Sequence, residues 1–351
     1  MTDSLSRRRF LPEWTVQQAV MLGWPTPTSD WSSHLEAIEA TFLTLIEVIA
    51  RYQQVLVTLP DEATRDRVGE TLSHLGVAPE RLTLIVAACD DTWARDYGPL
   101  TVSDNGQPHL LDYRFTGWGG KFAAERDNAL NDALAHAGVF RAPLHDCQHL
   151  VLEGGAVESD GQGTLLTTRH CLLNPNRNPG LDQAEIERHL QRDLGVDRVL
   201  WLDHGYLAGD DTDSHIDTLA RFCDENTIAY VRCDDPADEH FEAMACMARE
   251  LEALRTRDGT PYRLVPLPWP RPCFDPEDGH RLPATYANFL IINGAVLMPS
   301  YADPADRHAL AALADAFPQR DIIPVDCRQV IRQHGSLHCL TMQLPVGTLR
   351  V

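Results

Sequence analysis

The feature that most constrains the fold of this chain is a unit that recurs five times along its sequence. Each unit is an apolar strand, a loop, a second pair of strands joined by a tight turn, and a helix. The turns at Ser103–Gly106, Asp160–Gly163 and Asn293–Gly294 separate apolar runs, which is typical of β-hairpins. Helical patterns lie around residues 33–52, 122–137, 181–194, 237–256 and 304–317. The five units predict an α/β fold in which an internal repeat closes into a ring. A doubly wound sheet is the alternative, although its strands would not come in hairpins.

Composition and charge describe a globular protein with no basic surface for nucleic acid. The chain has 351 residues, 44% of them hydrophobic, and a formal net charge of −21. Binding to nucleic acid or to an anionic membrane requires concentrated Lys and Arg, so we expect neither partner. No segment approaches the roughly 18 apolar residues of a membrane helix. No linker divides the sequence, and we therefore expect one domain over residues 1–351.

The cysteines and the N-terminal residues bear on the compartment. None of the nine cysteines forms a C-x-x-C pair, so the sequence signals neither a disulfide framework nor a zinc site, and reduced thiols in the cytoplasm fit better. Residues 6–11 resemble a twin-arginine export signal. Residues 12–18, which follow, are polar where such a signal has an apolar run, so we expect a cytoplasmic protein.

Polar residues inside otherwise apolar strands are candidates for a shared site at the centre of the ring. They are Asp96, Glu153, His215, Asp217 and Cys339. His215 and Asp217 are two residues apart in a predicted strand, so their side chains should leave on one face, where a carboxylate raises the basicity of an imidazole. A buried carboxylate such as Glu153 is costly without a partner or ligand. Cys339 is either a nucleophile or one more buried thiol.

Simpler interpretations compete with a shared site. Asp96 could pair locally with Arg95 or cap a turn. The acid-dense run Asp210–Asp217 could hold a metal, but it lacks the glycine and the closing glutamate of a calcium loop. The spacing leaves a catalytic metal with His and carboxylate ligands open, although we expect no metal.

Several motifs in order along the chain resemble one known family. They are Pro12–Trp14, Gly23–Pro25, Trp93–Pro99, Gly117–Lys121, Glu153–Gly155, Asp160–Thr164, Asn174–Pro179, Asp211–Asp217, Tyr286–Phe289 and Gly335–Cys339. Across nearly its whole length the chain resembles the agmatine deiminase family of the pentein superfamily of guanidine-modifying proteins, which is related to the bacterial peptidylarginine deiminases. The resemblance implies a five-bladed, pseudosymmetric α/β propeller.

The resemblance also implies roles for the central residues. A guanidinium is planar and always protonated, so it is a poor electrophile that carboxylates can hold in bidentate fashion. Asp96 and Asp217 match the family's guanidinium-binding carboxylates, and Cys339 matches its nucleophile. His215 matches the general acid and base, and Glu153 matches a catalytic residue that holds the substrate and its protons. Two aromatic residues, Trp93 and Trp118, match family positions that flank the substrate, although core packing explains them equally well.

We therefore expect a cytoplasmic hydrolase of polyamine metabolism that converts agmatine and water to N-carbamoylputrescine and ammonia without a cofactor. The sequence does not rank the substrate tails, so arginine, a peptidyl arginine or another alkylguanidine stays open. His334–Ser336 keeps one glycine where agmatine deiminases carry a run of them, which adds to this question. An amidinotransferase, or a protein that binds a guanidinium without turnover, is a further alternative. A homo-oligomer is compatible with the sequence.

Overall fold

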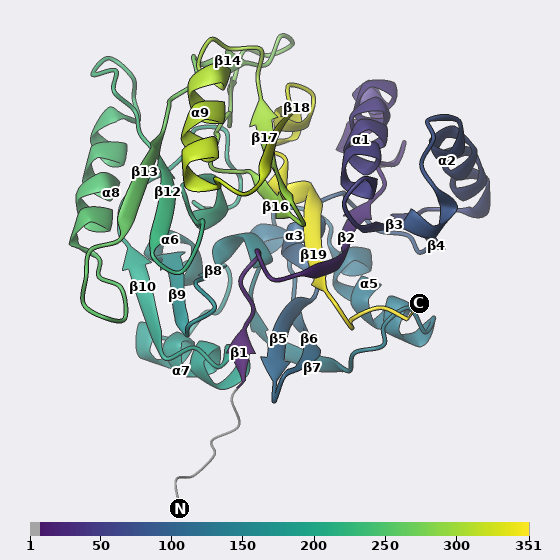
Figure 1. Ribbon diagram of the computed structural model, residues 1–351, viewed down its shortest axis with the longest axis horizontal. Helices are drawn as coiled ribbons and strands as arrows, with labels where there is room; N and C mark the ends of the chain where they lie inside the picture. Colours follow the sequence, from purple (N-terminus) through teal and green to yellow (C-terminus); the bar gives the residue numbers. More distant parts are fainter. Residues whose placement is uncertain (1–7, 351) are drawn as a thin grey trace, which may run out of the picture.

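The computed structural model describes residues 8–350 (Figure 1). Residues 6 and 7 of the arginine-rich stretch, like residues 1–5 and 351, lie outside the described part. The described chain is a mixed α/β structure with several separate sheets rather than one continuous sheet, so the doubly wound alternative is wrong. Within residues 8–350, no helix combines the length and the apolar character that crossing a membrane requires.

Five sheets of three or four strands share one pairing pattern. In each, an antiparallel pair is extended on one side by a strand that runs parallel to its second member. In hydrogen-bonded order the first two sheets are β19 (Thr341–Pro345), β2 (Gln17–Gly23), β3 (Gln54–Leu59), β4 (Leu82–Val86), and β1 (Arg9–Phe10), β5 (Leu100–Asp104), β6 (Gln107–Arg114), β7 (Leu144–Val151). The next three are β8 (Glu158–Ser159), β9 (Thr164–Thr168), β10 (Arg198–Leu202); β11 (Ala220–Phe222), β12 (Thr227–Val231), β13 (Arg263–Leu267); and β16 (Leu290–Ile292), β17 (Ala295–Ser300), β18 (Asp321–Asp326). A further hairpin pairs β14 (Cys273–Phe274) with β15 (Arg281–Leu282).

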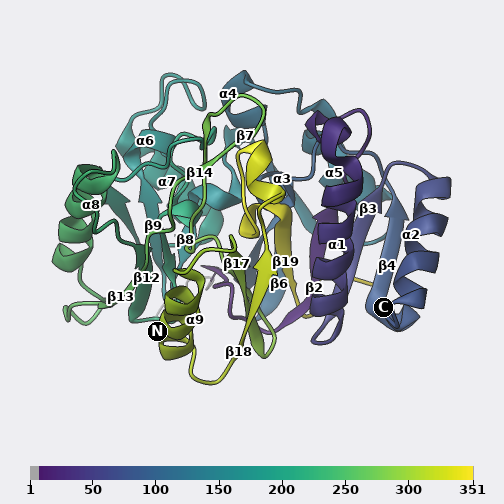
Figure 2. The ribbon, with the colours of Figure 1, turned by 90° about the horizontal axis from the view of Figure 1, so that it is seen from above.

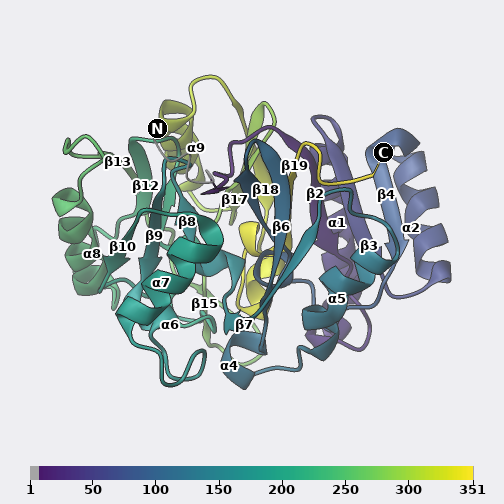
Figure 3. The same cartoon turned by 90° about the horizontal axis from the view of Figure 1, so that it is seen from below.

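Each parallel pair is connected through a helix, because parallel strands need a crossover that returns the chain to the same end of the sheet. The crossover helices are α1 (Leu35–Ala50), α2 (Glu62–His74), α5 (Glu125–His136), α7 (Gln183–Leu194), α8 (Phe241–Ala253) and α9 (Asp306–Ala316). Figures 2 and 3 show these helices around the outside of the sheets. The five predicted helices are thereby confirmed, whereas α2 was not predicted.

The boundaries of α7 follow from its end residues. Asp182 accepts a hydrogen bond from the backbone N–H of Glu185, and the Glu185 side chain accepts one from the backbone N–H of Asp182, which forms a capping box. The helix ends at Gly195, whose φ of 68° is left-handed. Ile186 and Leu190 pack inward from the same face.

The segments that carry the candidate site residues are short helical turns, so their prediction as strands is wrong. Asp96 lies in α3 (Ala94–Tyr97), and Glu153 directly precedes a one-turn 3-10 helix at Gly154–Ala156. His215 precedes a similar turn that contains Asp217, and Cys339 lies in a third, His338–Leu340. A single turn is too short to show helical periodicity, and its apolar residues merge in the sequence with those of the strand that follows.

Candidate active site

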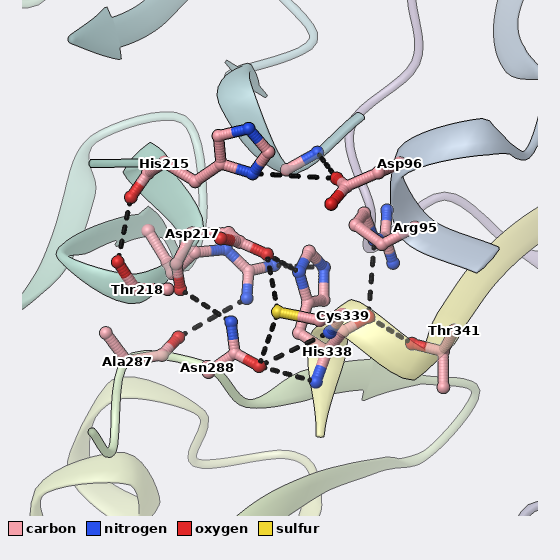
Figure 4. A network of polar contacts seen from close by, with 12 residues as sticks. Arg95, Asp96, His215, Asp217, Thr218, Ala287, Asn288, His338, Cys339 and Thr341 are labelled. Carbon is pink, nitrogen blue, oxygen red and sulfur yellow. Dashed lines mark hydrogen bonds and ion pairs between the residues drawn. The ribbon is translucent and has the colours of Figure 1, made fainter. Parts of the chain in front are cut away.

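Four helical turns bring the predicted site residues together. The turn 94–97 contacts the turns 154–156 and 338–340, and 154–156 also contacts 216–218. These turns lead into β5, β8, β11 and β19, the strands that begin the antiparallel pairs. Figure 4 shows Asp96, His215, Asp217 and Cys339 around a common centre. With Glu153, all are at most 4% exposed, so the polar groups are withdrawn from bulk water.

The Cys339 thiol contacts the side chain of Asn288 and faces the carboxylate of Asp217. Its Sγ lies 3.4 Å from Oδ1 of Asn288 and 3.8 Å from Oδ2 of Asp217. The same Asn288 oxygen accepts hydrogen bonds from the backbone N–H groups of His338 and Cys339, at 2.8 and 3.3 Å. Nδ2 of Asn288 donates to the carbonyl of Asp217 at 3.2 Å. Asn288 therefore fixes the thiol relative to Asp217.

Asp96 is oriented by two N–H donors and faces the imidazole of His215. Its Oδ1 accepts from the backbone of Gly155, and its Oδ2 accepts from the indole of Trp118, both at 2.9 Å. Nδ1 of His215 lies 3.6 Å from the Asp96 Oδ1. A Cβ on Gly155 would stand 2.7 Å from His215 Nδ1 and 2.8 Å from Asp96 Oδ1, so only glycine leaves room here.

Glu153 has the partner that its burial requires. Its Oε1 accepts a hydrogen bond from Nε of Arg177 at 3.0 Å, and both side chains are fully buried. Its Oε2 lies 3.8 Å from Nε2 of His215. Arg177 is itself bound to the carbonyl of Thr212 and to Asp213, so it anchors Glu153 to the loop that carries His215.

Asp217 contacts His338, which belongs to a buried network of polar and charged side chains. Nδ1 of His338 lies 2.8 Å from Oδ2 of Asp217, and its Nε2 lies 2.6 Å from Oε2 of Glu13. Nε2 of His338 also lies 3.0 Å from Nη2 of Arg221, so the ring is enclosed by two carboxylates and a guanidinium. Arg221 supplies positive charge to this network, because its guanidinium binds Glu13 at 2.6 Å and also Glu158.

Several buried polar atoms face the centre without a hydrogen-bond partner among residues 8–350. They are Oε2 of Glu153, both ring nitrogens of His215 and Oδ1 of Asp217. Buried polar groups in proteins are almost always satisfied, and exceptions mark functional sites. The two free oxygens are acceptors suited to a ligand that carries several N–H groups.

The electrostatics of the site set the protonation states of its acid and thiol groups. Burial, followed by the negative charges of Asp217 and Asp96, raises the pKa of the Cys339 thiol well above its usual value. Burial alone would lower the pKa of His215, but Asp96 and the adjacent Cys171 raise it well above its ordinary range. Burial would raise the pKa of Glu153, yet His215 and Arg177 hold it below normal. Without a ligand, therefore, the thiol is protonated, the imidazole is charged and Glu153 is ionised.

A pocket connects this centre with the surface. It has an empty volume of ≈ 410 Å³ and is lined by aromatic, acidic and thiol groups: Asp30, Asp91, Trp93, Asp96, Trp118, Phe122, Asp211, Thr212, Gln333, His334, Gly335 and Cys339. Trp93 and Trp118 are largely buried and also line the pocket, so they pack the structure and border the cavity at once. A Cβ at Gly335 would come within 2.3 Å of the Trp93 ring.

Other residues of the site were not singled out from the sequence. Asn288 and Arg177 lie within motifs that carried the family resemblance, and His338 precedes the cysteine, but nothing local distinguished them. Glu13 lies far away in sequence, and only the fold brings it beneath the site. The acidic run 210–217, considered above as a metal site, is partly explained by the structure of its loop. Asp210 accepts hydrogen bonds from Thr212 and Ser214 within this loop, at 2.6–3.1 Å.

The mixed α/β fold is that of enzymes that hydrolyse guanidines. The model of the Porphyromonas-type peptidyl-arginine deiminase family matches residues 9–345, and the chain belongs to this family. It is 32% identical to the agmatine deiminase of Pseudomonas fluorescens (strain SBW25), over 95% of this chain and 94% of that protein.

Solved structures extend the comparison. A Porphyromonas gingivalis structure, assigned as an arginine deiminase, is 49% identical and superposes with a TM-score of 0.91, over 98% of this chain and 100% of that one. A cysteine-to-serine variant of the C. jejuni agmatine deiminase with substrate bound is 36% identical, with a TM-score of 0.90 over 100% of this chain and 99% of that one.

Proposed function

We propose that this protein is a cysteine-dependent guanidine hydrolase that deiminates agmatine to N-carbamoylputrescine and ammonia. The observation that carries the proposal is the group of unpartnered buried acceptors beside a thiol. Among residues 8–350, Oδ1 of Asp217 and Oε2 of Glu153 lack hydrogen-bond partners, and the Cys339 thiol lies 3.8 Å from the other Asp217 oxygen. A guanidinium would satisfy these acceptors through its N–H groups and would place its central carbon near the sulfur.

Asp96 and Asp217 hold the guanidinium and keep its positive charge in this mechanism. That charge lowers the pKa of the Cys339 thiol, which loses its proton to solvent and attacks the central carbon. His215, charged in the free protein, donates a proton to the leaving nitrogen. The C–N bond breaks, ammonia departs, and a covalent thiouronium remains on Cys339.

Hydrolysis of the thiouronium completes the reaction. Neutral His215 accepts a proton from water, the hydroxide attacks the same carbon, and the C–S bond breaks to regenerate the thiolate. Ionised Glu153 stabilises the charged imidazole in both half-reactions. The net change in the substrate is the replacement of one nitrogen by one oxygen. The proton that the product releases converts ammonia to ammonium.

The acidic lining of the pocket favours agmatine over arginine. Asp30, Asp91 and Asp211 line the pocket in addition to the central carboxylates. They attract the ammonium end of agmatine and repel the carboxylate of free arginine, whereas a peptidyl arginine offers neither charge. The family description names peptidyl-arginine deiminases, so a peptidyl arginine is the second candidate substrate.

We further propose that the five sheets of shared pairing are the five blades of one pentein propeller domain, residues 1–351, in the cytoplasm. The supporting observations are the repeated pairing pattern and the helix that crosses between each parallel pair. One chain supplies all the pocket residues named above, so the proposed reaction requires no second subunit, and a homo-oligomer is compatible with it.

The test is ammonia release by the purified protein across agmatine, arginine, an N-acylated arginine amide and a simple alkylguanidine. We expect the highest kcat/KM with agmatine and mass-spectrometric detection of N-carbamoylputrescine. Preference for the arginine amide would assign a peptidylarginine deiminase, and transfer of the amidino group to an added amine would assign an amidinotransferase. Activity lost with a chelator would assign a metal hydrolase, and tight binding without ammonia release would refute enzymatic function.

A further inference from the structure

A cluster of histidine and aspartate side chains lies outside the active site, where β7 meets α7. His149 comes from β7, whereas His189 and Asp193 stand four residues apart on α7 and so share one face of that helix. Nε2 of His149 lies 3.1 Å from Oδ2 of Asp193, and the potential ligand atoms of all three residues lie within 4.8 Å of one another. Two ligands of a tetrahedral zinc ion with bonds of about 2.0–2.1 Å lie roughly 3.3 Å apart, which matches the first distance.

One exposed cation already binds all three groups. Nη2 of Arg192 lies 2.5 Å from Nε2 of His149, 3.0 Å from Nδ1 of His189 and 3.0 Å from Oδ2 of Asp193. A guanidinium has only donors, so an imidazole nitrogen that accepts from it turns a lone pair toward it. The cluster therefore brings two imidazole nitrogens and one carboxylate oxygen around a single cationic group, as a metal site does.

The neighbouring charges favour a cation at this point. Nε2 of His149 lies 3.1 Å from Oδ2 of Asp193 and donates a hydrogen bond to it when that nitrogen is protonated. In the tautomer whose lone pair faces Asp193, the two atoms repel each other unless positive charge lies between them. Arg192 supplies this charge from an exposed side chain, 58% of which is accessible, with Asp193 as its salt-bridge partner. Asp193 is buried, whereas the guanidinium lies on the solvent side, so a cation that binds more strongly can displace the guanidinium into solvent.

We propose that His149, His189 and Asp193 form a binding site for a divalent transition metal of the zinc class, with Arg192 as a displaceable cation. Imidazole and carboxylate ligands suit Zn²⁺, and solvent completes the coordination. The metal would join two structural units, because β7 belongs to the sheet that contains β5 and β6, whereas α7 is the crossover between β9 and β10. Binding to the folded chain alone therefore stabilises it.

The test is calorimetric titration of the full chain with Zn²⁺ in a non-chelating buffer, together with Tm measured against Zn²⁺ concentration. We expect saturable binding and a Tm that rises with Zn²⁺. His149→Ala and His189→Ala should each weaken binding on the order of 100-fold and abolish the rise in Tm. Arg192→Ala should tighten binding roughly two- to fivefold, because the competing cation is removed.

His136→Ala is the matched control. His136 and Asp132 form an exposed pair on α5 with the same four-residue spacing, 3.3 Å apart. This variant should bind Zn²⁺ like the wild type, which would show that spacing on a helix is insufficient. Zn²⁺ binding that survives in both His149→Ala and His189→Ala would place the metal elsewhere and overturn the proposal. Absence of binding, or an Arg192→Ala variant that binds Zn²⁺ no more tightly, would also overturn it.

Discussion

Asp96→Asn tests whether a carboxylate charge, rather than a polar side chain of the right shape, holds the substrate. The substitution preserves size but removes one negative charge and turns one acceptor oxygen into a donor. In the proposed complex Asp96 makes a charge-assisted contact with the guanidinium, so its loss should cost about 2–5 kcal/mol in transition-state binding. The expected fall in kcat/KM for agmatine is roughly 30-fold to several thousand-fold.

The structure also predicts a cost in stability for Asp96→Asn. Each Asp96 oxygen accepts one N–H, from Gly155 or from Trp118. Whichever way the amide turns, its NH₂ group faces one of these donors and leaves it unsatisfied. A lost buried acceptor costs about 1–3 kcal/mol, which corresponds to a fall in Tm of roughly 2–6 °C. A lower Tm alone therefore does not identify a purely structural role for Asp96.

Trp118→Phe separates the two effects. Phenylalanine removes the indole N–H that binds Asp96 but keeps an aromatic ring in the pocket and the charge of the carboxylate. We expect a Tm change similar to that of Asp96→Asn, with kcat/KM reduced by about tenfold or less. Ammonia release and thermal unfolding should be measured on the same preparations. If Asp96→Asn stays within about threefold of wild-type kcat/KM, or if Trp118→Phe loses as much activity as Asp96→Asn, the charge argument is refuted.

Further variants and the pH dependence test the other groups. Cys339→Ser should release no detectable ammonia yet still bind agmatine in calorimetry, because an alkoxide is far less available than a thiolate; retained turnover would reject the nucleophile. His215→Ala should be nearly inactive and accumulate a covalent adduct visible by intact-protein mass spectrometry, and wild-type turnover would contradict its role. His338→Gln removes the imidazole between Asp217 and Glu13 and should lower kcat/KM by roughly 10- to 100-fold; unchanged kinetics would contradict this positioning role. Because the pKa of Cys339 is raised, the protonated thiol predominates near neutrality. The rate of inactivation by iodoacetamide should therefore rise about tenfold per pH unit between roughly pH 7 and 9. A rate that does not change with pH would show that Cys339 is not a protonated thiol in the free protein.

The sequence predicted the repeated elements well wherever their patterns were long. The α9 helix is a run of strong helix formers, and α7 has clear signals at both ends, so both were found close to their observed bounds. Helix α2 is polar, with Val68 and Leu72 as its buried apolar residues, so its amphipathic pattern is weak. It was missed for that reason.

The site was predicted less completely than the fold, for a physical reason. His215 and Asp217 were expected on one face of a strand, but the turn between them points them differently: His215 toward Asp96 and Glu153, Asp217 toward His338 and Cys339. The groups that orient these side chains come from other parts of the chain. Asn288 and Arg177 act through contacts across sequence separations of 51 and 24 residues. No local pattern can signal such pairings.

The distribution of charge in the proposed site makes the activation of Cys339 depend on a bound substrate. Glu153 is paired with Arg177, and Asp217 with His338, whereas the Cys339 sulfur faces an amide oxygen and a carboxylate. Negative surroundings favour the thiol over the thiolate, so the resting sulfur is poorly nucleophilic. A guanidinium between Asp96 and Asp217 would reverse this balance, because it brings positive charge next to the sulfur. In that arrangement the substrate supplies the charge that activates its own nucleophile, and a neutral isostere of the same shape should fail to activate it.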